Sequence, residues 1–433
     1  MTPFWKLSGA GFAATAITYG PARMGFGLFL PELRSVFAIS TETAGLVSSL
    51  GFVGFFAALL ISQAMTTRKG PRLPVVAGLS AATLGLGIAA AAPNLPVLAV
   101  GVVFAMSSAG FSWTPFNNAV QRSVEDWSRP AALSSVSTGT SLGIAAAGVT
   151  ALAMSLGGVS WRLCWAAFAV GGALALLGNW AALKEVAGTP GAGPRQPWSV
   201  LRTASAVPML ALGLCYGVTS AIYISFAADH VAQAGGAAGL PAGASGGLLF
   251  VCYGLFGVLG LFTGRLKRAI GLPWLLRFLM VACALSFGLV AAWPTAGAAL
   301  ALSAGLQGLY VMMMSAVLSF WSARLFPGLP TRSFTAVLLA VAAGSVIGPV
   351  AAGFASEALG AATLFFGTGA LALATAACIR TSSIREEPEP IAVSVPPVHS
   401  TRCGPSGSSS SGARKAPQAS PSETVWLNKT TTL

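Results

Sequence analysis

Charged residues are scarce in this sequence. Only 8% of its 433 residues are Asp, Glu, Lys or Arg, whereas a soluble globular protein carries roughly a quarter. A protein folded in water must cover its surface with polar side chains, so this scarcity excludes a soluble domain. Hydrophobic residues make up 55% of the chain, and its mean hydropathy is +0.76. These values indicate that lipid is the main solvent.

Patterns typical of enzymes, metal sites and nucleotide sites are missing as well. The six cysteines form no Cys-x-x-Cys or Cys/His pattern, and five of them lie in apolar stretches, where a thiol packs as a small hydrophobe. No Walker loop, HExxH helix, GxSxG elbow or pair of mid-membrane carboxylates occurs. We therefore expect no metal, no cofactor, no direct use of ATP and no enzymatic activity. A membrane enzyme is the alternative from another class.

Twelve apolar segments are long enough to cross a bilayer, which needs about 20 residues of helix. The sequence thus predicts an all-α membrane protein with twelve transmembrane helices. The approximate spans are 8–36, 43–65, 74–92, 95–120, 131–154, 161–183, 207–228, 245–264, 273–292, 295–320, 333–357 and 361–379.

The net charge of +13 indicates the topology of the chain. A nucleic-acid partner is not expected, because long apolar runs separate the basic residues. With the amino terminus inside, alternating spans put 20 of the 24 Lys and Arg residues on the inner side, which follows the positive-inside rule. Arg34 and Arg162 alone fall outside, and Arg23 and Arg277 fall within spans. We predict a multi-pass protein of the plasma (inner) membrane with both termini in the cytoplasm.

Composition divides the chain into four parts. Residues 1–183 and 207–380 each hold six spans, and residues 184–206 form a cytoplasmic linker rich in Gly and Pro. Residues 381–433 are rich in Pro, Ser, Thr and Gly and cannot bury a core, so they are predicted to be a disordered cytoplasmic tail.

Three pairs of segments repeat between the two sets of six spans. Basic turns centred on glycine follow spans two and eight at an offset of 201: Arg68, Gly70 and Arg72, then Arg265, Arg268 and Gly271. Glycine rows lie in spans five and eleven at an offset of 205: Gly139, Gly143 and Gly148, then Gly344, Gly348 with Pro349, and Gly353. Tyr19 and Glu32 of span one correspond to Tyr216 and Asp229 of span seven at an offset of 197.

With these repeats the chain resembles the major facilitator superfamily of secondary transporters over residues 8–380. That family's signature after its second helix is Gly-x-x-x-Asp-Arg-x-Gly-Arg-Arg, which Arg68, Gly70 and Arg72 fit, while Gln63 and Thr67 replace its Gly and Asp. The resemblance implies two pseudo-symmetric six-helix halves, an inner gate at the basic turns and helix packing at the glycine rows. The missing Asp removes the acid of the family's inner-gate clamp. The run from Arg23 to Pro31 is similar to the first helix of a bacterial branch of facilitators.

Arg23 is the most conspicuous candidate site residue, because a charged side chain within a span is costly unless it faces a cavity or a partner. It either anchors an anionic substrate with its guanidinium fork, or snorkels outward or pairs with Glu32. Other polar residues of the family's central helices are expected to line the cavity or to form interhelical hydrogen bonds: Tyr19, Asn117, Asn118, Tyr216, Tyr223, Gln307 and Tyr310.

Glu32 and Asp229 lie near the outer ends of spans one and seven. They either carry protons or close an outer gate, or they are solvated charges at helix ends. The sequence therefore predicts a secondary active transporter that moves a small organic solute, with an anion and proton coupling as options, by alternating access in the lipid bilayer. A hydrophobic drug-like exporter and a non-transporting sensor or scaffold on the same fold stay open. A monomer suffices for this architecture.

Overall fold

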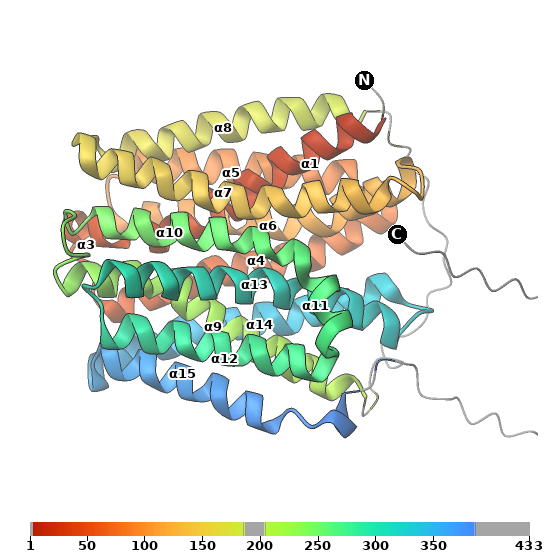
Figure 1. Ribbon diagram of the computed structural model, residues 1–433. Coiled ribbons are helices and arrows are strands. Elements are labelled where there is room, and N and C mark those ends of the chain that lie inside the picture. Colours follow the sequence, from red (N-terminus) through yellow and green to blue (C-terminus); the bar gives the residue numbers. More distant parts are fainter. Residues whose placement is uncertain (1–2, 185, 187–202, 204, 385, 387–433) are drawn as a thin grey trace, which may run out of the picture. The chain divides into compact units, whose positions relative to one another are not determined.

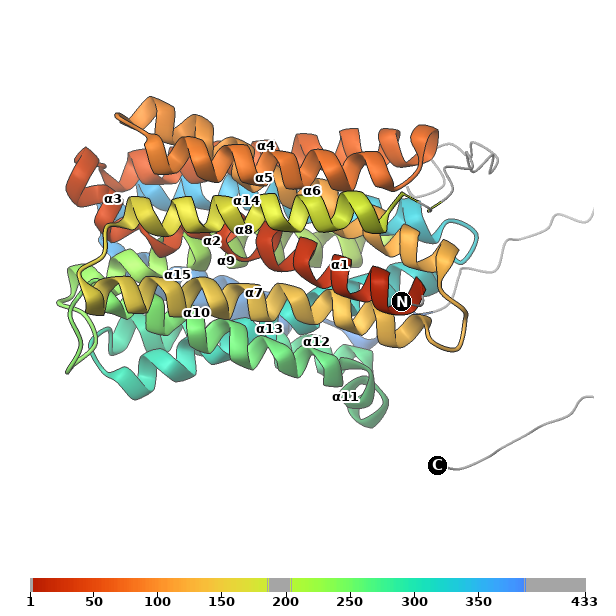
Figure 2. The same ribbon diagram turned by 90° about the horizontal axis from the view of Figure 1, so that it is seen from above.

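The computed structural model describes residues 3–184, 186, 203, 205–384 and 386, and the secondary structure of these residues is helical throughout. Figures 1 and 2 show long helices running side by side. The helices are α1 (Pro3–Tyr19), α2 (Pro21–Leu28), α3 (Leu30–Phe37), α4 (Thr41–Lys69), α5 (Arg72–Ala91), α6 (Leu95–Ser123), α7 (Arg129–Gly157), α8 (Trp161–Ala182), α9 (Ala206–Gln233), α10 (Ala244–Gly257), η2 (Val258–Phe262), α11 (Thr263–Ile270), α12 (Leu272–Ala292), α13 (Gly297–Leu325), α14 (Pro330–Leu359), α15 (Ala361–Cys378) and η3 (Thr381–Ser383).

Eleven of these helical segments are long and apolar enough to cross a membrane. The first predicted span is the twelfth, and it is divided into α1, α2 and α3. The sequence predicts one span over 8–36, and the structure divides it at Gly20 and Phe29. Pro21 and Pro31 each stand at the start of a new helix, where the missing N–H is tolerated. The break at Gly20 also lets the chain touch α7, because a Cβ there would lie 2.6 Å from the carbonyl oxygen of Gly143.

Span eight is interrupted as well, which the sequence did not predict. α10 ends at Gly257, and the five residues Val258–Phe262 form a 3₁₀ helix before α11 continues. Such a stretch inside a helix often marks a hinge. Most of the predicted linker and tail lies outside the described residues.

Large apolar side chains cover the outside of the bundle. On α8 they repeat along one face and are more than half exposed: Leu163, Val170, Leu174 and Leu177. This is the face that a helix turns toward lipid.

The repeated turns have the same backbone geometry in both halves. Gly70 ends α4 with φ of 79°, and Gly271 ends α11 with φ of 78°. Only glycine adopts this conformation without strain, so the two copies need glycine at equivalent places.

The repeated glycine rows also have the same neighbours in both halves. A Cβ on Gly143 would overlap the carbonyl oxygen of Ala16 in α1, and one on Gly344 would overlap that of Leu214 in α9. Gly139 makes a further close contact with α1, and Gly348 makes a further close contact with α9. The rows therefore fasten span five to span one, and span eleven to span seven, within each half.

The last glycine of each row contacts the other half instead. Gly148 of α7 touches the backbone of α10 near Val251, and Gly353 of α14 touches the backbone of α4 near Glu42. Pro349 of α14 adds its carbonyl oxygen, which would lie 2.5 Å from a Cβ on Gly45. Each row thus holds its own half together and then joins it to the other.

We predict that Gly143→Ala destabilises the protein, whereas Gly367→Ala in α15 does not. The methyl group at 143 would meet backbone of α1 and force the helices apart, and such overpacking costs about 1–3 kcal/mol. Gly367 has nothing within 4 Å of its Cβ position. Thermal unfolding in detergent should show a lower Tm for the first variant alone. Equal Tm values for both variants would contradict the close contact.

Candidate functional site

The bundle has two unlike ends. At one of them α4, α6, α11 and α13 each finish with Lys or Arg in the last turn, and we call this the basic end. It lies on the right in Figure 1, and the opposite end, with α3, lies on the left.

A cavity of about 410 Å³ lies between the two halves. One half contributes residues of α1, α2, α4, α6 and α7, and the other contributes α9, α10, η2, α11, α13 and α14. On α7 the lining runs from Leu133 to Ser141, and on α13 from Val311 to Phe320. These stretches belong to the parts of their helices nearer the basic end. The cavity therefore occupies that part of the bundle.

Arg23 is the charged residue of the cavity wall, and the other described lining residues are uncharged. Its guanidinium carbon lies 5.6 Å from the ring centroid of Tyr19, 5.3 Å from that of Phe52 and 4.4 Å from that of Phe55. The residue is 9% exposed, and within the described part of the chain no carboxylate pairs with it. Arg23 therefore neither snorkels to the surface nor pairs with Glu32. Three aromatic rings hold its uncompensated charge beside the cavity.

Hydroxyl groups supply most of the remaining polar lining. They come from both halves: Ser134, Ser137, Thr138, Thr140, Ser141, Ser220, Thr263, Ser315 and Ser319. Apolar side chains such as Trp113 and Met312 fill the spaces between them. A lining with one cation, hydroxyls and apolar surface suits a small organic molecule with an acidic group.

The eight residues predicted to bind substrate divide into two sets. Those that line the cavity are Tyr19, Arg23, Asn117 and Tyr216. Those that do not are Asn118, Tyr223, Gln307 and Tyr310. Tyr223 Oη instead shares a hydrogen bond with Ser303 Oγ at 3.0 Å, and Tyr310 Oη shares one with Thr219 Oγ1 at 3.0 Å. These two tyrosines form the interhelical hydrogen bonds that the sequence left as the alternative.

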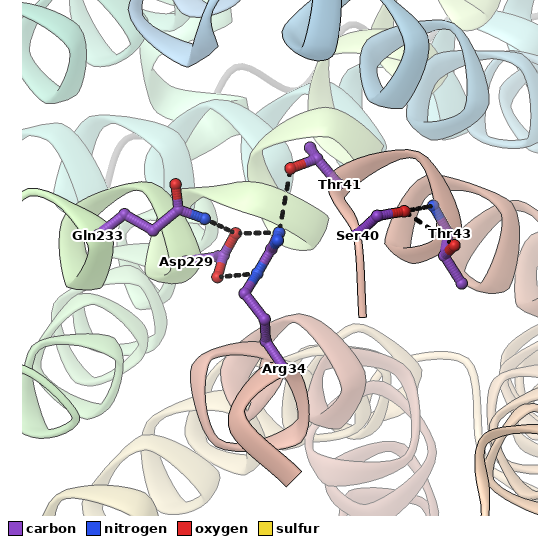
Figure 3. A network of polar contacts seen from close by, with 6 residues as sticks. All are labelled: Arg34, Ser40, Thr41, Thr43, Asp229 and Gln233. Atoms are coloured by element: carbon purple, nitrogen blue, oxygen red, sulfur yellow. Dashed lines mark hydrogen bonds and ion pairs between the residues drawn. The ribbon is translucent and has the colours of Figure 1, made fainter. Parts of the chain in front are cut away.

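An ion pair joins the two halves at the opposite end, where Arg34 of α3 faces Asp229 of α9 (Figure 3). Arg34 Nε donates to Asp229 Oδ1 at 3.0 Å, and Arg34 Nη2 donates to Oδ2 at 2.8 Å. Gln233 Nε2 donates to the same Oδ2 at 2.8 Å, and Arg34 Nη2 also donates to Thr41 Oγ1 at 3.2 Å. The contact therefore ties together α3, the start of α4 and the end of α9.

Glu32 has a different environment from Asp229. A Cβ on Gly243 would lie 3.0 Å from Glu32 Oε1 and 3.5 Å from Ser155 Oγ of α7. Glu32 Oε2 and Ser155 Oγ are both buried and lack a hydrogen-bond partner among the described residues. Asp229 is 3% exposed and paired, so it is no solvated helix-end charge.

The basic turns lie outside the cavity wall. Arg68, Arg265 and Arg268 are exposed, while Arg72 lies over the ring of Trp180 at 4.6 Å. At the same end of the bundle, Glu386 pairs with Lys267 of α11 and with Arg324 of α13, the latter at 3.1 Å.

The sequence model of the Major Facilitator Superfamily matches residues 12–228. The chain belongs to this superfamily. Its fold is that of several solved members, at sequence identities that establish the fold alone. A peptide transporter POT in complex with sulfate has a TM-score of 0.70 at 14% identity, covering 87% of this chain and 93% of its own. The nucleoside transporter NupG has a TM-score of 0.67 at 14% identity, covering 88% and 98%.

A third structure is a bacterial homolog to the human lysosomal transporter Spinster, in an inward-facing and unoccupied conformation. Its TM-score is 0.65 at 15% identity, and the match covers 87% of this chain and 94% of that one. Among curated sequences, monocarboxylate transporter 11 of Homo sapiens is 33% identical over 109 residues, and that of Mus musculus is 35% identical over 98. Each alignment covers 22% of the relative's length.

Sequence reasoning missed three contributors to this architecture. The sequence predicts Arg34 only as an outer basic residue, although a lone cation on a side with few basic residues and with acids such as Asp229 is a signal that it has a partner. Phe52 and Phe55, which hold Arg23, carried no signal, because aromatic residues are common in spans.

We predict that Arg34→Gln and Asp229→Asn are not additive. Removing either partner leaves the other partly buried and unpaired, so a double-mutant cycle on thermal unfolding should give a coupling of about 1–3 kcal/mol. The surface pair Arg129 and Asp126, with Asp126 90% exposed, is the matched control and should couple by less than about 1 kcal/mol. Additive effects of the first pair would show that the contact does not hold the two halves together.

Proposed function

We propose that this chain is a secondary active transporter that moves a small organic anion by alternating access. The observation that carries the proposal is the cavity between two facilitator halves, with Arg23 as its charged lining residue and without a described carboxylate to neutralise it. In this superfamily fold, rocking of the halves would expose such a cavity to each side of the membrane in turn.

The basic end is the cytoplasmic end in this proposal, since basic residues are retained inside. The structure then corresponds to the inward-facing state, with the cavity in the cytoplasmic part of the bundle and the Arg34–Asp229 pair on the outside. The protein acts in the plasma (inner) membrane, both termini are cytoplasmic, and one chain is the transporting unit.

A single negative charge is the best match for this cavity, because one guanidinium offers one bidentate site for a carboxylate. The partial likeness to monocarboxylate transporter 11 supports the same substrate class. The aromatic rings around Arg23 and the hydroxyls elsewhere would contact the apolar and polar parts of the substrate.

Proton coupling is part of the proposal. A coupled transporter needs an acid whose surroundings change between its two states. Asp229 would lose Arg34 when the outer end opens, and Glu32, whose Oε2 is unpaired, lies beside α7 and the turn before α10. Both positions are suited to taking up a proton from the outside.

We predict that Arg23→Ala abolishes ligand-induced thermal stabilisation and uptake, and that Arg23→Lys keeps part of both, because Lys retains the charge but loses the fork. Aliphatic and aromatic monocarboxylates and dicarboxylates would be screened by thermal shift, and the stabilising compounds tested for uptake into proteoliposomes. Lys184→Ala, which removes an exposed cation outside both the cavity and the basic turns, is the control and should behave as wild type. Full activity of Arg23→Ala would refute the anion site.

We predict that uptake follows an inward pH gradient in wild type, and that Asp229→Asn or Glu32→Gln removes this dependence while substrate exchange without a gradient persists. An amide cannot carry the proton, but it leaves the substrate site intact. Flux into proteoliposomes, with and without the gradient, separates the two properties. Unchanged gradient dependence in both variants would remove these acids as coupling groups.

A further inference from the structure

One face of α13 carries three polar residues at successive turns, and only the middle one is unpartnered. Ser303 and Tyr310 are hydrogen-bonded to Tyr223 and Thr219 of α9, each at 3.0 Å. Gln307 lies between them and is 0% exposed. Neither its Nε2 nor its Oε1 has a partner within the described part of the chain. Gln307 therefore lies on one face of α13 between two residues whose side chains are hydrogen-bonded, while its own amide has no described partner.

Tyr253 of α10 brings a second unpartnered group to the same region. It is 1% exposed, and its Oη lacks a hydrogen-bond partner among the described residues. Its ring centroid lies 6.3 Å from that of Tyr223. α10 and α13 are in direct contact here, because a Cβ on Gly308, next to Gln307, would meet the carbonyl oxygen of Tyr253. Both unpartnered groups thus lie where α9, α10 and α13 meet.

These groups lie just beyond the end of the cavity that is farther from the basic end. On α13 the cavity lining begins at Val311, one turn past Gln307, and on α10 it begins at Gly257, one turn past Tyr253. On α9, Ser220 and Ile224 line the cavity beside Tyr223. The two unpartnered groups therefore belong to the part of the bundle that is packed in this state.

An amide and a phenol buried without partners are unfavourable, and each would be replaced at no loss by an apolar side chain if this packed state were its whole role. Alternating access gives them a second state. When the halves open at the Arg34–Asp229 end, α2 would withdraw from Ile224 of α9, against which Gly27 packs, and the junction of α9, α10 and α13 would become part of the cavity wall.

We propose that Gln307 and Tyr253 form a polar subsite of the outward-facing cavity, which binds an uncharged hydroxyl group of the substrate while Arg23 binds its carboxylate. This inference rests on the proposed transport function and narrows its substrate class to hydroxylated organic monoanions. Gln307 Oε1 accepts from the hydroxyl, and Gln307 Nε2 or Tyr253 Oη donates to it.

The test compares Tyr253→Phe and Gln307→Leu with the matched control Tyr310→Phe, which removes a hydroxyl that is already bonded. Tyr253→Phe should leave Tm unchanged or raise it, whereas Tyr310→Phe should lower it by removing the hydrogen bond between Tyr310 of α13 and Thr219 of α9. Uptake from the outer side would be measured in right-side-out vesicles for acids that differ by one hydroxyl, namely lactate against propionate and mandelate against phenylacetate. Both subsite variants should raise KM at least tenfold for the hydroxy acids and leave KM for the others unchanged. Equal effects on both members of each pair would overturn the subsite.

A labelling experiment keeps the inference testable if none of these acids is transported. Gln307→Cys, in a background without the native cysteines, should react with a membrane-impermeant maleimide added from the outer side. Leu279→Cys, at an equally buried position on α12, is the control and should not react. Absence of labelling at 307 would overturn the inference whatever the fate of the transport proposal. If position 307 is labelled but no screened anion is taken up, the outward-facing cavity is supported. The same result would refute the anion transport function.

Discussion

The arrangement of this protein depends on close contact between helix backbones at glycine. Lipid gives two apolar helices no hydrophobic reason to associate, so their attraction comes from van der Waals contact at short range. Each of the two glycine rows brings helix backbones into close contact at two places, first within its own half and then between the halves. The contact between α2 and α9 is of the same kind, since a Cβ on Gly27 would overlap the carbonyl oxygen of Ile224. Contacts without side-chain interlocking can separate and form again, as alternating access requires.

The polar groups specify which arrangement is occupied. Arg34 and Asp229 join the halves at one end, and the cavity with Arg23 lies toward the other. Each feature depends on the packing of the helices. The ion pair forms only where α3 and α9 approach closely, and the charge of Arg23 can be buried only beside a cavity. The 3₁₀ break in span eight lies at the cavity wall, which Val258, Gly260 and Leu261 help to line. Close packing at glycine thus limits how the helices can be arranged, and a few charges select which arrangement is occupied.

Much of this fold can be predicted from the sequence, because the features that indicate it lie within short stretches of the chain. Span length, the scarcity of charge and the repeat offsets predicted twelve helices in two related halves, and Gly70 and Gly271 predicted equivalent turns. The broken first span was not predicted, since the sequence alone does not say whether Pro21 kinks or ends a helix. Asp229 was recognised as a candidate, but its partner Arg34 lies 195 residues away, and such a pairing depends on how the halves meet. Tyr253 was missed because a tyrosine in a span looks like any other packed aromatic residue.

The central claim is that the two ends of the bundle open in alternation. Spin labels at Val36 and Ala234 would report the end closed by the ion pair, and labels at Ser134 and Gly264 would report the cavity between α7 and α11. Double electron–electron resonance on the protein in lipid nanodiscs, with and without a stabilising anion, gives both distances. The account predicts two populations in which one distance lengthens as the other shortens. A single, unchanging distance at Val36 and Ala234 under all conditions would contradict it.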